Sequence, residues 1–275
     1  MDAVGPSLSV LSFVAELDPG SSRANRERLL RAAEAAGEAA DNPERRVALL
    51  PERWWRDDDE GAYRDAVRDL ARRWRCWVVG GSMHARQPDG TTRNLGWLAA
   101  PDGTERGTYH KRHPFAAEVL AGVGEGAGPA GFDLGGVRVT VAICADLFDP
   151  ALFRGAGPED PAAILVCAAS TSRKPDPGFA RALWTHVAVA RAWERNAHVV
   201  ISDWAHALHR AGMRTCGVSG HADPSRQTPP LFLPTPAPAA WIRLPLEPLA
   251  RLRRDRRSRN FLWPDDDPPT TVRER

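Results

Sequence analysis

Three residues that lie far apart in the chain, Glu52, Lys111 and Cys144, carry side chains that can act together in catalysis. Glu52 follows the apolar run 47–51, and Cys144 follows the apolar run 137–143. A carboxylate, an ammonium group and a thiol can together break a carbon–nitrogen bond. The carboxylate takes a proton, the thiolate attacks a carbonyl carbon, and the ammonium group stabilises the oxyanion. The set therefore indicates acyl-transfer chemistry.

The lysine at position 111 is unusual for this chain. Among its 37 Lys and Arg side chains, reading the sequence finds only two lysines, Lys111 and Lys174. Lysine is a compact charge with three rotatable donors, whereas arginine is a planar fork. Lys111 shares the segment 109–113 with two histidines and an arginine, which favours a role that a guanidinium group cannot fill. The alternative is that one of two lysines falls here without a chemical role.

Cys144 stands between a predicted strand and a short helix predicted within residues 149–154. Backbone N–H groups are unpaired at the start of a helix. We therefore expect the pKa of the thiol to be lowered there, and the N–H groups to serve as oxyanion donors. The alternative is that Cys144 is a small buried apolar residue, the common fate of a single cysteine.

Glu52 directly follows Pro51, at the carboxyl end of a predicted strand. Ligand sites of α/β sheets collect at that edge. The alternative is that Glu52 is a solvated loop acid close to the acidic stretch 57–60. We interpret that stretch as the solvated start of a helix, because acidic residues favour helix N-termini.

Apolar runs of strand length alternate with helical patterns along the chain, which predicts an α/β architecture. No clear linker interrupts the pattern before about residue 222, so we expect one domain. We predict helices at residues 22–40, 60–74 and 177–195, and strands at 7–14, 46–50, 76–81, 95–100, 105–109, 137–143, 163–168, 198–202 and 241–244.

The composition is that of an ordinary globular protein, with 43% hydrophobic and 26% charged residues among 275. The net charge of +2 predicts no acidic partner. The apolar runs are shorter than the roughly 20 residues of a membrane helix, and no secretory signal is visible. The four cysteines form no C-x-x-C pair. We therefore expect free thiols, a cytoplasmic location, and neither a membrane nor a nucleic-acid partner.

The chain resembles the carbon–nitrogen hydrolases of the nitrilase superfamily over residues 7–260, which leaves 261–275 as a C-terminal tail. The main motifs are a Glu after Pro51, a Lys in the pattern Tyr-x-Lys-x-His at 109–113, and Ile-Cys-x-Asp at 143–146. Together in this order the motifs are far more specific than any one of them. Further matches are Asn25, Pro150, Arg154, the segment 191–194, the segment 216–219 and the pair 223–224.

The resemblance implies a four-layer α-β-β-α sandwich that assembles as a homodimer or higher homo-oligomer through one helical layer. It implies a catalytic triad of Glu52, Lys111 and Cys144 with neither metal nor organic cofactor. Glu118 matches a second family glutamate that supports the lysine, and the Ala145 backbone N–H matches an oxyanion donor; both are candidate substrate-binding residues. The implied reaction cleaves a small amide or N-carbamoyl compound through a thioester and releases ammonia or an amine.

The sequence departs from the family pattern at several positions. Position 145 is Ala, where nitrile-cleaving members tend to carry Trp followed by Glu, and here Asp146 follows. Amide substrates are therefore favoured, with nitrile hydrolysis on the same triad as the alternative. Asp203 stands where an Asn is common, and Arg195 precedes Asn196. A non-catalytic protein of the same fold is the remaining alternative.

Three other hypotheses rest on single features. A Cys–His hydrolase would use His113, but it would explain neither Glu52 nor Lys111. Histidine pairs of the spacing His-x-x-His occur at 110–113 and 206–209, yet no matching Cys or carboxylate cluster completes a zinc site. The basic run 251–257 is typical either of nucleic-acid binding or of the solvated face of a terminal helix, and the second reading is favoured.

Overall fold

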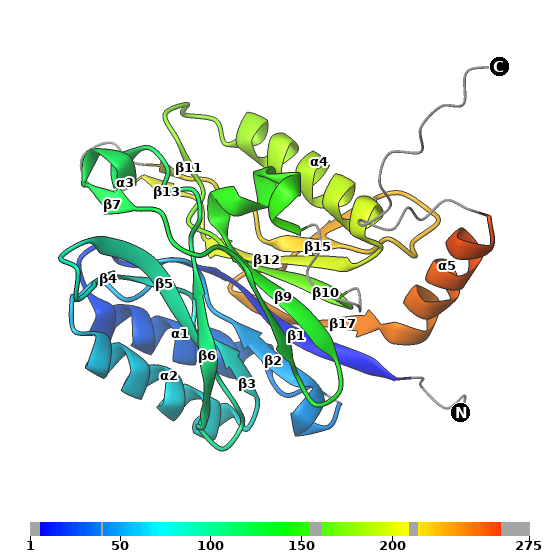
Figure 1. Cartoon of the computed structure of the whole chain (residues 1–275), viewed down its shortest axis with the longest axis horizontal. Helices are drawn as coiled ribbons and strands as arrows, with labels where there is room; N and C mark the ends of the chain where they lie inside the picture. Colours follow the sequence, from blue (N-terminus) through cyan, green and yellow to red (C-terminus); the bar gives the residue numbers. More distant parts are fainter. Residues whose placement is uncertain (1–5, 40, 154–160, 209–213, 260–275) are drawn as a thin grey trace.

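The computed structural model describes residues 6–39, 41–153, 161–208 and 214–259 (Figure 1). Its helices are α1 (Ser22–Ala36), α2 (Glu60–Trp74), α3 (Ala117–Leu120), α4 (Gly178–Arg195) and α5 (Leu246–Ser258), with short 3₁₀ helices η1 (Pro43–Arg45), η2 (Cys144–Phe148) and η3 (Pro150–Phe153). The longer strands are β1 (Ser7–Ala15), β2 (Arg46–Leu49), β3 (Trp77–Val79), β4 (Met83–Arg86), β5 (Thr92–Ala99), β6 (Glu105–His110), β8 (Ala130–Asp133), β9 (Arg138–Ile143), β10 (Ala163–Cys167), β12 (His198–Trp204), β15 (Gly220–Ala222), β16 (Phe232–Pro234) and β17 (Ala239–Pro245). Two-residue strands are β7 (Val123–Gly124), β11 (Thr171–Ser172), β13 (Ala207–Leu208) and β14 (Arg214–Thr215).

One strand, β1, joins the two halves of the sheet. The strand order is β4-β5-β3-β2-β1-β12-β10-β9-β8. Within this order, six consecutive strands are parallel to one another: β3, β2, β1, β12, β10 and β9. Only the last two residues of β1 pair with β12, as Val14↔Asp203 and Ala15↔Trp204, while its earlier part pairs with β2 and with antiparallel β17. The sheet therefore divides at β1 into two halves.

Helices cover the outer side of each half. Figure 1 shows α1 and α2 against the half that contains β2 and β3, and α4 on the opposite side of the molecule. Side chains of β2 and of the residue after it alternate between two cores. Val47 and Leu49 enter the core that includes β9 and β10. Ala48 and Leu50 enter the core beneath α1 and α2. The predicted four-layer α-β-β-α sandwich is confirmed.

Most predicted helix and strand positions agree with the structure, and the differences have local causes. Helix α1 ends at Ala36 instead of residue 40, because Gly37 adopts a φ of 68° and stops the helix. The acidic stretch before α2 is a helix start as predicted, since the Asp59 side chain accepts a hydrogen bond from Ala62 N. All four cysteines are free thiols, as predicted.

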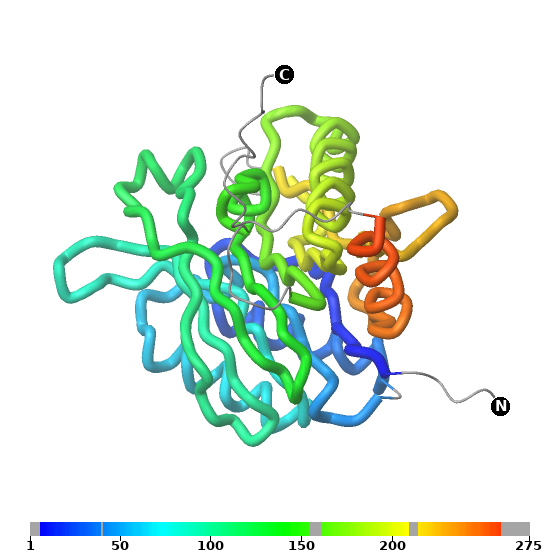
Figure 2. The backbone as a smooth tube through the Cα atoms, turned by 45° about the vertical axis from the view of Figure 1, so that its right-hand side comes forward, coloured from blue at the N-terminus to red at the C-terminus, as the bar shows by residue number. Residues whose placement is uncertain are grey.

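The basic run near the C-terminus belongs to α5, which lies beside the C-terminal end of α4 (Figure 2). Arg253 and Arg256 donate hydrogen bonds to the carbonyl oxygens of Asn196 and Trp193 at 2.9 Å each. Part of the run is therefore used to pack the terminal helix. The predicted tail, 261–275, lies outside the described residues. Within the described part of the chain, no helix combines the length and apolarity needed to span a bilayer.

Gly96 allows β5 to pack closely against its neighbours. A Cβ atom at this position would lie 2.3 Å from Gly81 O and 2.4 Å from the ring of Tyr109. Gly96→Ala should therefore lower the free energy of unfolding by about 1–3 kcal/mol, the usual cost of overpacking. The measurement is urea unfolding followed by tryptophan fluorescence. Gly131→Ala in β8, where the nearest atom would be 3.8 Å away, is the matched control and should change little.

Candidate active site

The predicted residues meet where parallel strands end. Glu52 is the third residue after β2, Cys144 opens η2 directly after β9, and Lys111 directly follows β6. Glu52 N donates a hydrogen bond to Ala168 O, just beyond β10, at 3.1 Å. The carboxyl edge of the parallel sheet thus collects segments that are distant in sequence, as ligand sites in α/β proteins require.

Lys111 is buried between two carboxylates. Its Nζ lies 2.7 Å from Glu52 Oε1 and 2.6 Å from Glu118 Oε2. The exposed fractions of the three residues are 2% for Lys111, 2% for Glu52 and 6% for Glu118. Asn94 Nδ2 donates to Glu52 Oε1 at 2.8 Å and to Glu118 Oε1 at 2.7 Å, so one amide group also bridges the two acids. Burial opposes the charge on Lys111, but Glu52, the Cys144 sulfur and Glu118 outweigh it and raise the pKa of Lys111.

Glu118 is oriented by groups from three directions. His84 Nε2 lies 2.9 Å from its Oε1, and Phe115 N donates to its Oε2 at 3.1 Å. Burial would raise the pKa of Glu118, but His84 and Lys111 lower it well below its usual range. Since its oxygens already meet Lys111, Asn94, His84 and Phe115, Glu118 is better suited to holding Lys111 than to contacting a substrate.

The second oxygen of Glu52 faces the other side of the site. Ala169 N donates to Glu52 Oε2 at 3.0 Å, and Trp204 Nε1 donates to the Glu52 backbone carbonyl at 2.7 Å. The Glu52 carboxylate and the Ala169 N–H both act on the Cys144 thiol, the carboxylate raising its pKa and the N–H lowering it. The structure therefore brings the carboxylate, the ammonium group and the thiol together.

The residue Cys144 is 6% exposed, and the environment of its thiol differs from the sequence-based expectation. Burial and the Glu52 carboxylate raise the pKa of Cys144 well above its ordinary value, and Lys111 offsets only part of this effect. The expected lowering of its pKa is therefore wrong for the resting site: the burial of the thiol outweighs the helix start. Because the thiol keeps its proton in the resting site, attack by the sulfur requires a base that accepts this proton, and the Glu52 carboxylate is the neighbouring candidate.

Ala145 occupies the first turn of η2, where backbone N–H groups have no partner inside the helix. It is half-buried, directly after Cys144. This position suits an N–H donor to an oxyanion formed at the cysteine, the role expected for Ala145.

Backbone strain gathers at the site. Among the described non-glycine residues, five have a positive φ, and Arg75 and Asn196 are simply the C-caps of α2 and α4. The other three are Arg53 (51°), Ala116 (48°) and Cys144 (49°). Arg53 directly follows Glu52, Ala116 lies two residues before Glu118, and the third is the cysteine itself. Such strain is typical of functional positions.

Asp146 ties the cysteine turn to the lysine segment. Its carboxylate accepts hydrogen bonds from Arg112 N at 3.1 and 3.0 Å and from His113 N at 2.9 Å. The ring of His113 lies against Asp149, with 2.9 Å between Nε2 and Oδ2. The charged groups with the strongest effect on the Cys144 thiol are nevertheless Glu52 and Lys111, which favours them over His113 as partners of the cysteine.

Two further motif residues hold the loops that carry the site. Asn25 Nδ2 in α1 donates to Trp54 O, two residues after Glu52, at 2.8 Å. Arg191 Nε in α4 donates to Leu147 O, in the turn that Cys144 opens, at 3.0 Å. Pro150 starts η3, and Arg154 lies outside the described residues.

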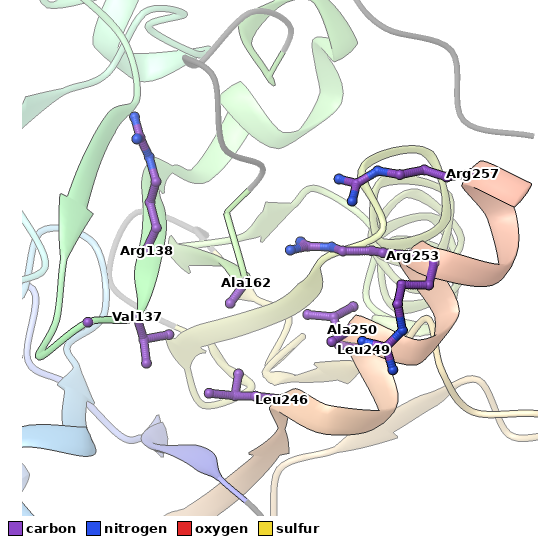
Figure 3. Close-up of a pocket in the computed structure, with 10 residues that line it drawn as sticks. Val137, Arg138, Ala162, Leu246, Leu249, Ala250, Arg253 and Arg257 are labelled. Carbon is purple, nitrogen blue, oxygen red and sulfur yellow. The ribbon is translucent and has the colours of Figure 1, made fainter.

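Metal ligation has no support within the part of the chain that the structure describes. No group of three His, Cys, Asp or Glu side chains there is arranged to hold a metal ion. A cavity of about 420 Å³ lies elsewhere, between α5 and the start of β9, and is lined by Arg138, Arg253, Arg254 and Arg257 among others (Figure 3). Its lining includes none of the predicted site residues.

Sequence reasoning missed Asn94 and His84, which complete the network around the two acids. Asn94 is fully buried in β5, directly before the apolar part of that strand. A buried amide in such a strand must find hydrogen-bonding partners, and this was the available signal. His84 lies in β4, a short edge strand that the pattern of apolar residues did not reveal.

Comparison with known proteins gives a consistent result. A family model described as carbon-nitrogen hydrolase matches residues 18–225. No curated protein matches the chain. Among solved structures, a CN-hydrolase superfamily protein of Xanthomonas campestris, XC1258, has a TM-score of 0.74 and 19% identity, over 91% of this chain and 95% of that one.

Two other solved structures are similar. Nit3 of Saccharomyces cerevisiae, a member of branch 10 of the nitrilase superfamily, has a TM-score of 0.73 and 17% identity over 90% of this chain and 94% of its own. An amidase from Nesterenkonia sp. has a TM-score of 0.72 and 20% identity over 94% of this chain and 97% of its own. That amidase has also been solved in complex with butyramide. At these identities the structural matches establish the fold.

The burial of Asp146 predicts a pH effect on stability. Burial raises the pKa of Asp146 to about 6, so the folded protein holds a proton there that the unfolded chain releases near pH 4. The stability that protonated Asp146 contributes is therefore lost as the pH rises from about 4 to about 6. Relative to the wild type, Asp146→Asn should gain about 3 kcal/mol between pH 4 and pH 7 in urea unfolding.

Asp149→Asn is the control for this measurement. His113 lowers the pKa of Asp149, so its contribution is present at neutral pH and lost in acid, the opposite trend. A difference between Asp146→Asn and the wild type that stays constant with pH would contradict the assignment.

Proposed function

Because the chain belongs to the carbon-nitrogen hydrolase family, and is thus an enzyme that hydrolyses carbon–nitrogen bonds, we propose that it acts on a small amide or N-carbamoyl compound through a cysteine thioester. One observation carries the proposal. A buried ammonium group, Lys111, is held by two carboxylates next to the thiol of Cys144. The three residues Glu52, Lys111 and Cys144 are the proposed catalytic triad.

In the first step Glu52 takes the proton of the Cys144 thiol as the sulfur attacks the carbonyl carbon of the amide. This order suits the raised pKa of Cys144, because the thiolate forms only when the base accepts the proton. The carbonyl oxygen becomes an oxyanion, which Lys111 Nζ and the Ala145 N–H stabilise. Lys111 needs no change of charge for this, since its pKa is raised and the amine stays protonated.

In the second step the tetrahedral intermediate collapses. Glu52 gives its proton to the departing nitrogen, ammonia or an amine leaves, and the acyl group stays on sulfur as a thioester. Glu52 then removes a proton from water, which attacks the thioester carbon. The carboxylic acid leaves, and the proton returns to the Cys144 sulfur, so Glu52 serves alternately as base and acid.

Amides are favoured over nitriles for two reasons. Ala145 and Asp146 follow the cysteine, in place of the Trp and Glu that nitrile-cleaving members of the family tend to carry. The similar Nesterenkonia protein is an amidase that has been solved with butyramide bound, which supports a simple amide as a first substrate to test. Nitrile hydrolysis on the same residues is the alternative activity.

The proposed assembly is a homodimer or higher homo-oligomer of this chain. Helix α4 supports it, because Phe179, Leu183 and Trp193 expose 63%, 43% and 40% of their surfaces. Exposed large apolar side chains on one helix are typical of a surface that a partner covers.

The direct test is an assay of ammonia release from a panel of short amides, N-carbamoyl compounds and nitriles. We expect turnover of at least one amide or N-carbamoyl compound, and a loss of turnover in Cys144→Ala because the nucleophile is gone. Turnover that survives in Cys144→Ala, or no turnover of any compound by the wild type, would contradict the proposal. Preferential turnover of nitriles would establish the alternative activity.

Lys111→Arg tests the role of the ammonium group. A guanidinium group is too wide for the space between Glu52 and Glu118, which lie 2.7 and 2.6 Å from Nζ. The variant keeps the charge but should lose about 100- to 1000-fold in kcat/KM, the usual cost of a missing oxyanion donor. Lys174→Arg is the matched control, because the Lys174 ammonium only stacks on Phe179, 4.2 Å from the ring centre. Near-normal turnover by folded Lys111→Arg would refute the role.

A further inference from the structure

Arg53, the residue directly after Glu52, has an unusual backbone conformation. Its φ is 51°, in the left-handed region that non-glycine residues rarely adopt. The Arg53 N–H donates to Ser82 Oγ at 3.0 Å, and Ser82 is fully buried. The protein thus keeps an arginine in a strained position next to the proposed base, where glycine would fit without strain.

The guanidinium group of Arg53 has no hydrogen-bonding or ion-pair partner among the described residues. Its Nε is buried and unbonded, although the side chain as a whole is only half-buried. Other arginines near the site are engaged: Arg56 Nε donates to Pro19 O at 2.7 Å, and Arg112 pairs with Glu125 at 3.2 Å. Arg53 therefore stands out as a partly buried guanidinium group to which the described residues offer no hydrogen-bonding partner.

The charge of Arg53 lies at the edge of the acid network. Burial lowers the pKa of Arg53, and the carboxylates of Glu52 and Glu118 oppose that effect. Burial lowers the pKa of His84, which contacts Glu118, and the Arg53 charge acts in the same direction. Because Arg53 directly follows Glu52 in the chain and its charge interacts with both acids, Arg53 belongs to the edge of this network.

The two carboxylates cannot serve as the missing partner of Arg53. Glu52 Oε1 accepts from Lys111 and Asn94, and Glu52 Oε2 accepts from the Ala169 N–H. The oxygens of Glu118 are similarly occupied. An unpaired, partly buried charge is costly to keep. A ligand that brings its own anion would remove that cost.

The charges of the site also indicate what kind of ligand this is. Lys111 brings one positive charge, while Glu52 and Glu118 bring two negative ones. This trio alone would repel an anionic substrate. The negative group of such a substrate would therefore have to lie beside a further cation, and Arg53 supplies one. The planar fork of an arginine matches a carboxylate, to which it can donate two parallel hydrogen bonds.

We propose that Arg53 binds a carboxylate carried by the substrate, so that the preferred substrate is a small amide that also bears a carboxylic acid. This inference rests on the proposed amide hydrolysis and specifies its substrate class. The acid lies either on the acyl side, as in the monoamide of a dicarboxylic acid, or on the nitrogen side, as in an N-carbamoyl amino acid. Arg53 is a specificity-determining residue in either case.

The test compares substrate pairs that differ in charge but hardly in shape. Succinamate and succinamide place the acid on the acyl side, and N-carbamoylglycine and its amide place it on the nitrogen side. The wild type should favour the acid of at least one pair. In Arg53→Gln the ratio of kcat/KM between acid and neutral substrate should fall about 10- to 100-fold, mainly through KM, because a charged hydrogen bond is lost.

Two further variants make the result specific. Arg53→Lys keeps the charge without the fork and should keep part of the preference, which also covers the case in which Arg53→Gln folds poorly. Arg251→Gln removes an equal charge on α5, where Arg251 pairs with Glu247 at 3.0 Å, and should leave the ratio unchanged.

Several results would overturn the proposal. One is a wild type that favours the neutral member of both pairs. Another is an equal loss on acid and neutral substrates in Arg53→Gln, which would mean that Arg53 only balances the charge of Glu52 and Glu118. Turnover of neutral amides alone would leave amide hydrolysis standing and refute only the role of Arg53. No turnover of any amide above the Cys144→Ala blank would refute both.

Discussion

Two buried carboxylates share one buried ammonium group, and the geometry of the site depends on this arrangement. Removing ions from water costs several kcal/mol for each ion unless close partners replace the water. Here Glu52 and Glu118 each lie within 2.7 Å of Lys111 Nζ, and Asn94 donates to both acids. Because each partner is held by the others, the position of the ammonium group is set by the fold before any substrate arrives.

The fold supplies this arrangement by ending parallel strands at one edge. Glu52 comes from the end of β2 and Cys144 from the end of β9, while Ala169, beyond β10, donates to Glu52. Left-handed backbone at Arg53 and Cys144 turns the chain sharply at these ends. Hydrogen bonds from α1 and α4 to the following loops then fix the turns. Helices on opposite sides of the molecule therefore both contribute to the precision of the site.

The sequence was sufficient for the elements with strong patterns and for the residues that follow them. The continuous apolar run from Val47 to Leu50 predicts the strand before Glu52, and that strand is β2. Asn94 was not predictable in the same way, because its role depends on two acids that are distant in sequence. The pKa of Cys144 was predicted in the wrong direction, since local position indicates a helix start while three-dimensional burial decides the outcome. Short edge strands such as β4 carry too few residues to show a period.

The pairing of β1 has a consequence for biosynthesis. Along one edge this strand pairs with β17, a segment far later in the sequence, from Ser7↔Pro245 to Phe13↔Ala239. The partner of β1 on this edge is therefore translated long after β1 itself, and contacts of such long sequence separation form slowly. Until then the nascent chain presents an open strand edge, the kind of surface on which aggregation begins. Chaperone capture during translation is the natural protection for a protein built in this order.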